Sequence, residues 1–99
     1  MALAGCGLDE AALAEQLTRY RRLGAGAVVT RRSPLELAVD FGAEPDRGLL
    51  DTTIKVERGC CSFFALQYDE AARRLTVAVA DPERRAALDG IQAALGVVA

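Results

Sequence analysis

Hydrophobic residues recur at helical spacing near the start of the chain. The apolar positions are Leu8, Ala12, Leu13, Leu17 and Tyr20, and charged residues such as Glu15 and Arg19 lie between them. Gly24 follows the last of these turns, and glycine commonly ends a helix. The pattern predicts an amphipathic helix over residues 8–23.

The hydrophobic period then changes from helical spacing to alternation. Residues 25–31 are typical of a short strand, and Ser33-Pro34 is typical of a turn. Residues 35–41 alternate apolar and polar side chains strictly, which indicates a strand with one buried face. These two strands are close enough in the sequence to form a hairpin.

A second helical pattern starts after the loop at residues 42–44. Pro45 suits the first turn of a helix, where a missing backbone N–H costs nothing. The apolar stripe that follows contains Leu49, Leu50, Thr53, Ile54, Val56 and Cys60. This predicted helix ends at the adjacent cysteines Cys60 and Cys61.

The remainder of the chain repeats the same order of elements. Residues 63–68 and 75–80 are predicted strands joined by a turn over residues 69–74. Asp81-Pro82-Glu83 then supplies an N-cap, a proline and an acid at the start of a last helix. In that helix Leu88, Ile91 and Leu95 are expected to point inward, and Gly96 is expected to end it.

The two halves of this pattern resemble each other. Leu35, Leu37 and Val39 correspond to Leu75, Val77 and Val79 at an offset of 40, whereas Pro45 and Ile54 correspond to Pro82 and Ile91 at an offset of 37. We therefore predict an α+β fold in which an N-terminal helix precedes a duplicated ββα unit.

The duplicated unit is expected to form a four-stranded antiparallel sheet. Both repeat helices should pack on one face, with the N-terminal helix at an edge or on the other side. The second face carries small and mixed side chains at Glu36, Ala38, Asp40, Thr76, Ala78 and Ala80. It is expected to meet water or a second copy of the chain, so a homodimer is a candidate assembly.

Length and charge narrow the classes of protein to consider. Ninety-nine residues, 52% of them hydrophobic, predict a single domain over residues 1–99. Twelve basic against fourteen acidic residues, with no polybasic run, argue against nucleic acid as a partner. No stretch approaches the roughly 20 apolar residues of a membrane span, so no membrane association is expected.

The cysteines indicate the compartment. Leu3-Ala4-Gly5-Cys6 matches the residues around a lipoprotein cleavage site but lacks the charged and apolar regions of a signal peptide. Three cysteines cannot all form disulfides within one chain. We therefore expect a cytoplasmic protein with reduced thiols.

The stretch Glu57-Arg58-Gly59-Cys60-Cys61-Ser62-Phe63-Phe64 carries the strongest chemical signal. Adjacent Cα atoms lie about 3.8 Å apart, whereas an unstrained disulfide needs about 4.4–6.8 Å. A disulfide between Cys60 and Cys61 would therefore be strained and easily reduced. As thiols on a helix the two side chains would diverge by about 100°, so they reach one ion only where the helix loosens, which the flanking glycine and serine allow. The alternative is that each cysteine is a small buried hydrophobic residue.

Cys6 is a candidate third sulfur. It precedes the first predicted helix, where the positive end of the helix dipole favours a thiolate. If that helix starts beside the end of the second one, three sulfurs converge. Three thiolates without histidine suit soft ions such as mercury(II), arsenite or copper(I).

Zinc would require a fourth ligand, either water or Glu57, which lies three residues before Cys60 on the same predicted helical face. The alternative for Glu57 is an ordinary solvated charge on the helix surface, and the sequence favours it. The candidate metal site consists of Cys6, Cys60 and Cys61, and Glu57 is kept as its candidate oxygen ligand. Arg58 or the bound cation would be needed to ionise the cysteine pair.

These motifs resemble a family of small bacterial proteins that carry a Glu-x-x-Cys-Cys-Pro-Phe motif. The likeness covers nearly the whole chain and includes the early cysteine, the Arg-Tyr-Arg-Arg-Leu end of the first helix and the Asp-Pro-Glu of the last. The resemblance implies a setting of heavy-metal resistance and places the family's cysteines on Cys6, Cys60 and Cys61 and its acid on Glu57. Ser62 replaces the family's proline, so we expect a less abrupt exit from the helix.

Three classes of function remain open from the sequence. The first is a protein that binds a soft metal or metalloid ion, namely mercury, arsenite, copper(I) or zinc, for sequestration, delivery or sensing. The second is an interaction module, most simply a homodimer, with cysteines that serve only packing. The third, a thiol redox enzyme or a carbon–metal bond lyase, lacks Cys-x-x-Cys spacing and a histidine base, so an enzyme is disfavoured.

Overall fold

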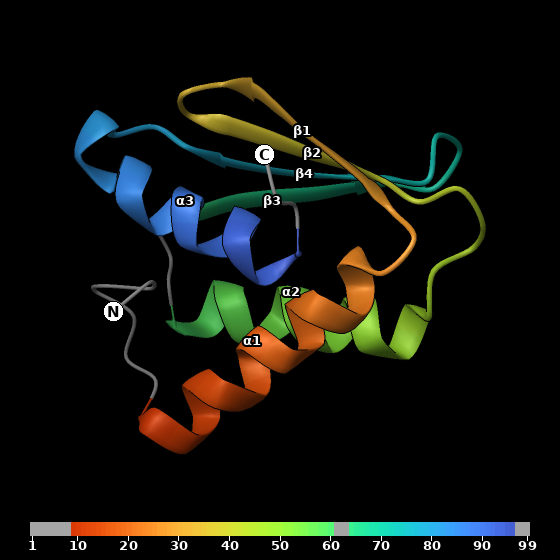
Figure 1. Ribbon diagram of the computed structural model, residues 1–99, viewed down its shortest axis with the longest axis horizontal. Coiled ribbons are helices and arrows are strands. Elements are labelled where there is room, and N and C mark those ends of the chain that lie inside the picture. The colour runs from red at the N-terminus through yellow and green to blue at the C-terminus, as the bar shows by residue number, and fades with distance from the viewer. Residues whose placement is uncertain (1–8, 61–63, 97–99) are drawn as a thin grey trace.

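The computed structural model describes residues 9–60 and 64–96, apart from the side chain of Cys60. Its elements follow the order α1-β1-β2-α2-β3-β4-η1-α3. Figure 1 shows a sheet on one side of the molecule and the three α-helices on the other. This arrangement confirms the predicted α+β class.

The helices begin and end close to the predicted positions. α1 spans Glu10–Gly24, α2 spans Arg47–Cys60, and α3 spans Arg85–Ala94 after the 3₁₀ turn η1 at Pro82–Arg84. Side chains cap the starts: Asp9 accepts from the N–H of Ala12, and Asp46 and Asp81 play the same part before α2 and η1. The proline therefore begins a 3₁₀ turn rather than α3 itself.

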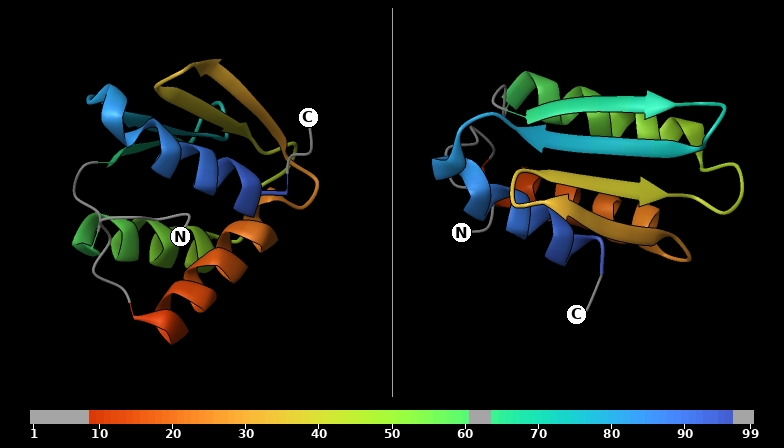
Figure 2. Two further views of the ribbon diagram at one scale, coloured as in Figure 1. Left: turned by 60° about the vertical axis from the view of Figure 1, so that its left-hand side comes forward. Right: turned by 90° about the horizontal axis from the view of Figure 1, so that it is seen from above.

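The sheet contains β1 (Val28–Ser33), β2 (Glu36–Asp40), β3 (Phe64–Asp69) and β4 (Arg74–Val79). All neighbouring strands are antiparallel, in the order β1-β2-β4-β3. β1 starts three residues later than predicted, because the backbone first turns at Gly26, which has φ of +78°. Figure 2 shows the sheet in front of all three helices when seen from above, so no described element covers its outer face.

The pairing of β2 with β4 supports the internal repeat. Leu37 lies directly opposite Val77, and Val39 lies opposite Leu75. Val79 donates its N–H to the carbonyl of Leu35, which extends the same register. Leu37 therefore pairs with its own counterpart in the repeat, Val77. A local twofold axis through this pair relates each residue of β2 to its counterpart in β4, for example Val39 to Val79.

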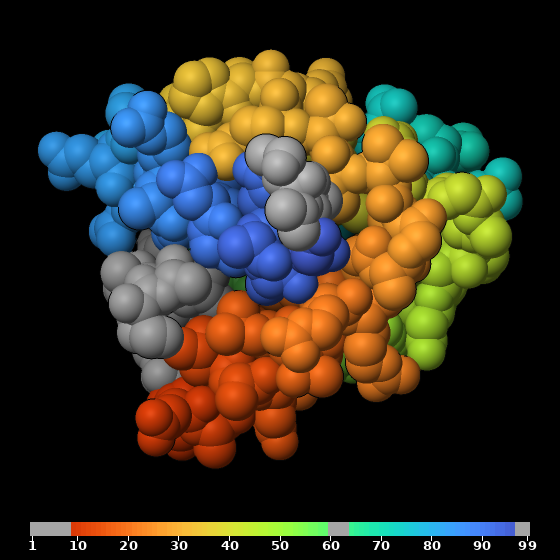
Figure 3. Space-filling model, in the orientation of Figure 1, coloured from red at the N-terminus to blue at the C-terminus, as the bar shows by residue number. Residues whose placement is uncertain are grey.

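The position of α1 differs from the prediction. It packs neither at a sheet edge nor on the open face, but against α2 and α3 on the helical side. Figure 3 shows the surface of α1 running beneath α3. The physical reason is that α2 and α3 leave apolar side chains between them, and Tyr20 and Leu23 of α1 bury there.

One hydrophobic core lies between the sheet and the helices. Its fully buried members come from every layer and include Tyr20, Leu37, Val39, Leu50, Leu75, Val77, Leu88 and Ile91. The inward direction predicted for Leu88, Ile91 and Leu95 is confirmed. No helix among the described residues is both long and apolar enough to span a membrane.

The contact between the ends of α1 and α3 gives a test of this packing. A Cβ on Gly24 would lie 1.9 Å from the carbonyl oxygen of Leu95, a backbone atom that cannot rotate away. We expect Gly24→Ala to lower the free energy of unfolding by about 2 kcal/mol or more, measured by urea denaturation.

Gly48→Ala is the matched control. A Cβ on Gly48 meets only Asp46 Oδ1, at 3.5 Å, within α2. Because alanine favours helix over glycine, this change should raise the free energy of unfolding by up to about 1 kcal/mol. Equal effects of the two substitutions would contradict the close approach of α1 to α3.

Candidate functional site

A buried polar cluster lies where α1 crosses α2. Gln16 and Tyr20 project from α1, one turn apart, toward Thr53 and Glu57 of α2. All four side chains are buried, Glu57 with 1% of its surface exposed. Such groups are costly inside a protein unless hydrogen bonds replace the lost water.

One oxygen of Glu57 is well satisfied. Tyr20 donates its hydroxyl to Glu57 Oε1 at 2.6 Å, and Gln16 Nε2 donates to the same oxygen at 2.9 Å. Gln16 also donates to the carbonyl of Thr53 at 3.0 Å and accepts from Arg19 at 2.7 Å. These bonds fix the orientation of the carboxyl group.

The other oxygen of Glu57 has no such contact. Oε2 is buried, yet it makes no hydrogen bond with any residue that the structure describes. As a carboxylate it needs a donor or a cation, and as a carboxylic acid it needs an acceptor. An unsatisfied buried oxygen of this kind calls for an explanation, such as strain, a bound water or ion, or a functional role.

The second repeat provides an internal comparison for Glu57. The offset of 37 that relates Pro45 and Ile54 to Pro82 and Ile91 relates Glu57 to Ala94, which is partly buried on α3. The fold therefore accepts a small apolar side chain at the equivalent position of its other half. The acid on α2 is not required by the architecture of the repeat.

The expectation that Glu57 is a solvated charge is wrong. It failed because helical periodicity alone cannot show that α1 would cover that face of α2. Gln16 and Tyr20 were not predicted as site residues. The signal for Gln16 was present, since a polar residue interrupts the apolar face of α1 between Leu13 and Tyr20.

The structure leaves the predicted sulfur ligands untested. Cys6 and Cys61 lie outside the described residues, and of Cys60 only the backbone, at the end of α2, is described. No group of three potential metal ligands occurs among the side chains that the structure describes. These described side chains do not include any of the three cysteines.

The prediction for Cys6 requires the start of α1 to lie beside the end of α2, so the relative direction of the two helices matters. Gln16 of α1 meets Glu57 of α2, while Leu23, further along α1, shares a cavity with Leu49, further back along α2. The two helices therefore run in opposite senses. The start of α1 and the end of α2 lie at the same end of the pair (Figure 1).

Arg58 has a structural contact of its own. Its Nη2 donates to the carbonyl of Leu66 on the edge strand β3 at 2.6 Å. This bond ties the end of α2 to the sheet and satisfies a carbonyl that has no further strand beside it.

Comparison with known protein families, curated proteins and solved structures finds no match for this chain.

The hydroxyl of Tyr20 gives a pH test of the cluster. Burial raises the pKa of Tyr20 well above the ordinary 10.0, and the adjacent Glu57 raises it further. The folded state thus holds this proton more tightly than the unfolded state does. The resulting stability is fully present below pH 10 and declines as the pH rises above it.

The substitution Tyr20→Phe tests this hydrogen bond, because it removes one of the two donors to Glu57 Oε1. Below pH 10 the variant should be less stable by about 1–3 kcal/mol in urea unfolding. Between about pH 10 and 11.5 the difference should shrink by up to about 1.4 kcal/mol per pH unit. Tyr68 is present in both proteins, so its titration cancels. A difference independent of pH over this range would contradict the buried hydrogen bond.

Proposed function

We propose that this protein binds a soft metal or metalloid ion through Cys6, Cys60 and Cys61, with Glu57 as an adjacent oxygen ligand. The observation that supports it best is the buried carboxyl group of Glu57. One of its oxygens is held in place, and the other has no hydrogen bond among the described residues.

Helical spacing relates this carboxyl group to the cysteine pair. Glu57 and Cys60 both belong to α2 and lie three residues apart, a separation that makes residues neighbours on a helix surface. A carboxylate and thiolates at neighbouring helical positions would offer a mixed donor set. Sulfur favours mercury(II), copper(I) and arsenite, whereas an added oxygen suits zinc as a fourth ligand.

The reach of the chain is compatible with Cys6 as a third sulfur. From Gln16 back to Asp9, the N-cap of α1, the chain extends about 10 Å, and from Glu57 on to Cys60, α2 extends about 4.5 Å toward the same end of the pair, at about 1.5 Å per residue, along axes that diverge there (Figure 1). Cys6 precedes Asp9 by three residues, which span at most about 10 Å. This length allows the sulfur to return to the end of α2.

The chemistry of capture follows from these groups. Each thiol that binds a metal cation gives up its proton to the solvent, so binding of zinc, copper(I) or mercury(II) releases protons and weakens at low pH. With arsenite, which is neutral As(OH)₃ at neutral pH, each thiol proton instead leaves with an arsenic hydroxyl as water while the sulfur–arsenic bond forms. Because Arg58 is engaged at the sheet edge, the incoming cation itself is the main agent that ionises the cysteine pair. Binding without turnover serves sequestration, delivery or sensing, and the chain is proposed as a binding protein rather than an enzyme.

Metal titration of the reduced protein tests the proposal. Zinc, copper(I), mercury(II) and arsenite would be added separately, with stoichiometry from native mass spectrometry and affinity from competition with a chelator or thiol of known strength. We expect one ion per chain. The double variant Cys60→Ser/Cys61→Ser should lose at least about 100-fold in affinity, since two of the soft donors are gone. Unchanged binding by this variant would end the proposal.

The role of Glu57 is tested separately. Glu57→Gln keeps the size of the side chain and an oxygen for Tyr20 and Gln16 but removes the charge. Zinc affinity should fall about 10-fold or more, while mercury(II) affinity should change less, because mercury prefers sulfur. Glu10→Gln, an exposed acid in the first turn of α1, is the matched control. Equal zinc binding by the two variants would exclude Glu57 as a ligand.

A further inference from the structure

The hydrogen bonds around Glu57 leave only one of its oxygens open to a ligand. Each oxygen of a carboxylate has about two lone-pair positions. Oε1 accepts two bonds, from the hydroxyl of Tyr20 at 2.6 Å and from Gln16 Nε2 at 2.9 Å, whereas Oε2 accepts none from the described residues. An ion can therefore bind Oε2 without displacing a donor, while binding to both oxygens would displace one.

The two donors to Oε1 are themselves firmly placed. Gln16 Nε2 also donates to the carbonyl of Thr53 at 3.0 Å, and the amide oxygen of Gln16 accepts from Arg19 at 2.7 Å. The amide group therefore cannot turn over without losing bonds on both of its ends. Tyr20 is fully buried and belongs to the hydrophobic core, whose close packing fixes the direction of its hydroxyl.

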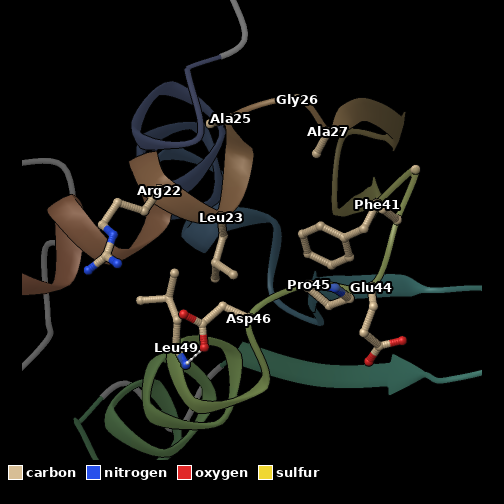
Figure 4. A pocket seen from close by; sticks show the side chains of 12 residues that line it. Arg22, Leu23, Ala25, Gly26, Ala27, Phe41, Glu44, Pro45, Asp46 and Leu49 are labelled. Atoms are coloured by element: carbon tan, nitrogen blue, oxygen red, sulfur yellow. Dashed lines mark hydrogen bonds between the residues drawn. The ribbon is translucent and has the colours of Figure 1, made fainter.

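Polar contact between the two helices is concentrated toward the end of α2. Within the part of the chain that the structure describes, each side-chain hydrogen bond between α1 and α2 involves Gln16 or Tyr20. Toward the start of α2 the helices instead direct Leu23 and Leu49 into one half-open cavity, as Figure 4 shows. The polar contact therefore lies about one helical turn from Cys60, where the proposed sulfur ligands begin.

We propose that Tyr20 and Gln16 are positioning residues, which make Glu57 bind an ion through Oε2 alone and so raise the preference of the site for zinc over cadmium. This inference rests on the proposed function. Zinc in protein sites takes four ligands, so a single oxygen completes a set of three sulfurs. Cadmium has the same charge and also binds thiolates, but it is larger and favours more ligands. A carboxylate supplies such an extra ligand by binding through both of its oxygens.

The ratio of zinc affinity to cadmium affinity tests this role. Each metal would be titrated alone into the reduced full chain, in competition with a chelator of known strength. Tyr20→Phe removes one donor from Oε1 and opens this oxygen to the ion, and Gln16→Met removes the other donor independently. In each variant the ratio should fall about 10-fold, the usual effect of losing a group that orients a metal ligand. A general loss of stability would instead weaken the binding of both ions alike.

Two controls isolate the action on Glu57. Tyr68→Phe removes a buried hydroxyl that has no hydrogen bond with the described residues, so its ratio should match that of the wild type. In a Glu57→Gln background, Tyr20→Phe should no longer change the ratio, because the carboxylate on which Tyr20 acts is absent.

Ultraviolet absorption from cadmium–thiolate bonds separates this inference from the function on which it rests. If the wild type shows this absorption but Tyr20→Phe and Gln16→Met keep the wild-type ratio, the positioning role is wrong and the metal site stands. A change of ratio that persists in the Glu57→Gln background would also overturn the positioning role. If cadmium produces no thiolate absorption in the wild type, the proposed function fails and this inference fails with it.

Discussion

The pairing of β2 with β4 holds the two halves of this protein together. It joins two ββα units edge to edge, so that their helices emerge on the same face of one sheet. The central residues Leu37 and Val77 are completely buried. Every later feature depends on this arrangement, because α2 and α3 form the surface on which α1 packs only when both lie on one side.

α1 is the element that distinguishes the two halves. Toward α3 it offers close backbone contact at Gly24, and toward α2 it offers the polar side chains of Gln16 and Tyr20. A helix that served only to cover apolar surface would have no need of the second contact. Apolar packing therefore does not account for the buried cluster around Glu57.

The sequence was sufficient for the elements and the repeat, since local periodicity and turn residues determine both. It did not place α1, because the choice between the two faces of a sheet depends on what the other helices leave uncovered. The same tertiary effect explains the error on Glu57. The residue has the polarity of a surface position, but α1, which is distant in the sequence, packs over it and brings Tyr20 into contact with it. Cys60 and Cys61 were identified by chemistry alone and stay a prediction.

The local twofold axis has an evolutionary consequence. A strand that pairs with its own counterpart in this register is self-complementary, which is the property of the contact in a symmetric dimer. A single ββα unit with this strand could associate with a second identical unit before any fusion of the two. Fusion then frees each copy to diverge, and the contrast between Glu57 and Ala94 is the kind of asymmetry that an identical pair could never have acquired.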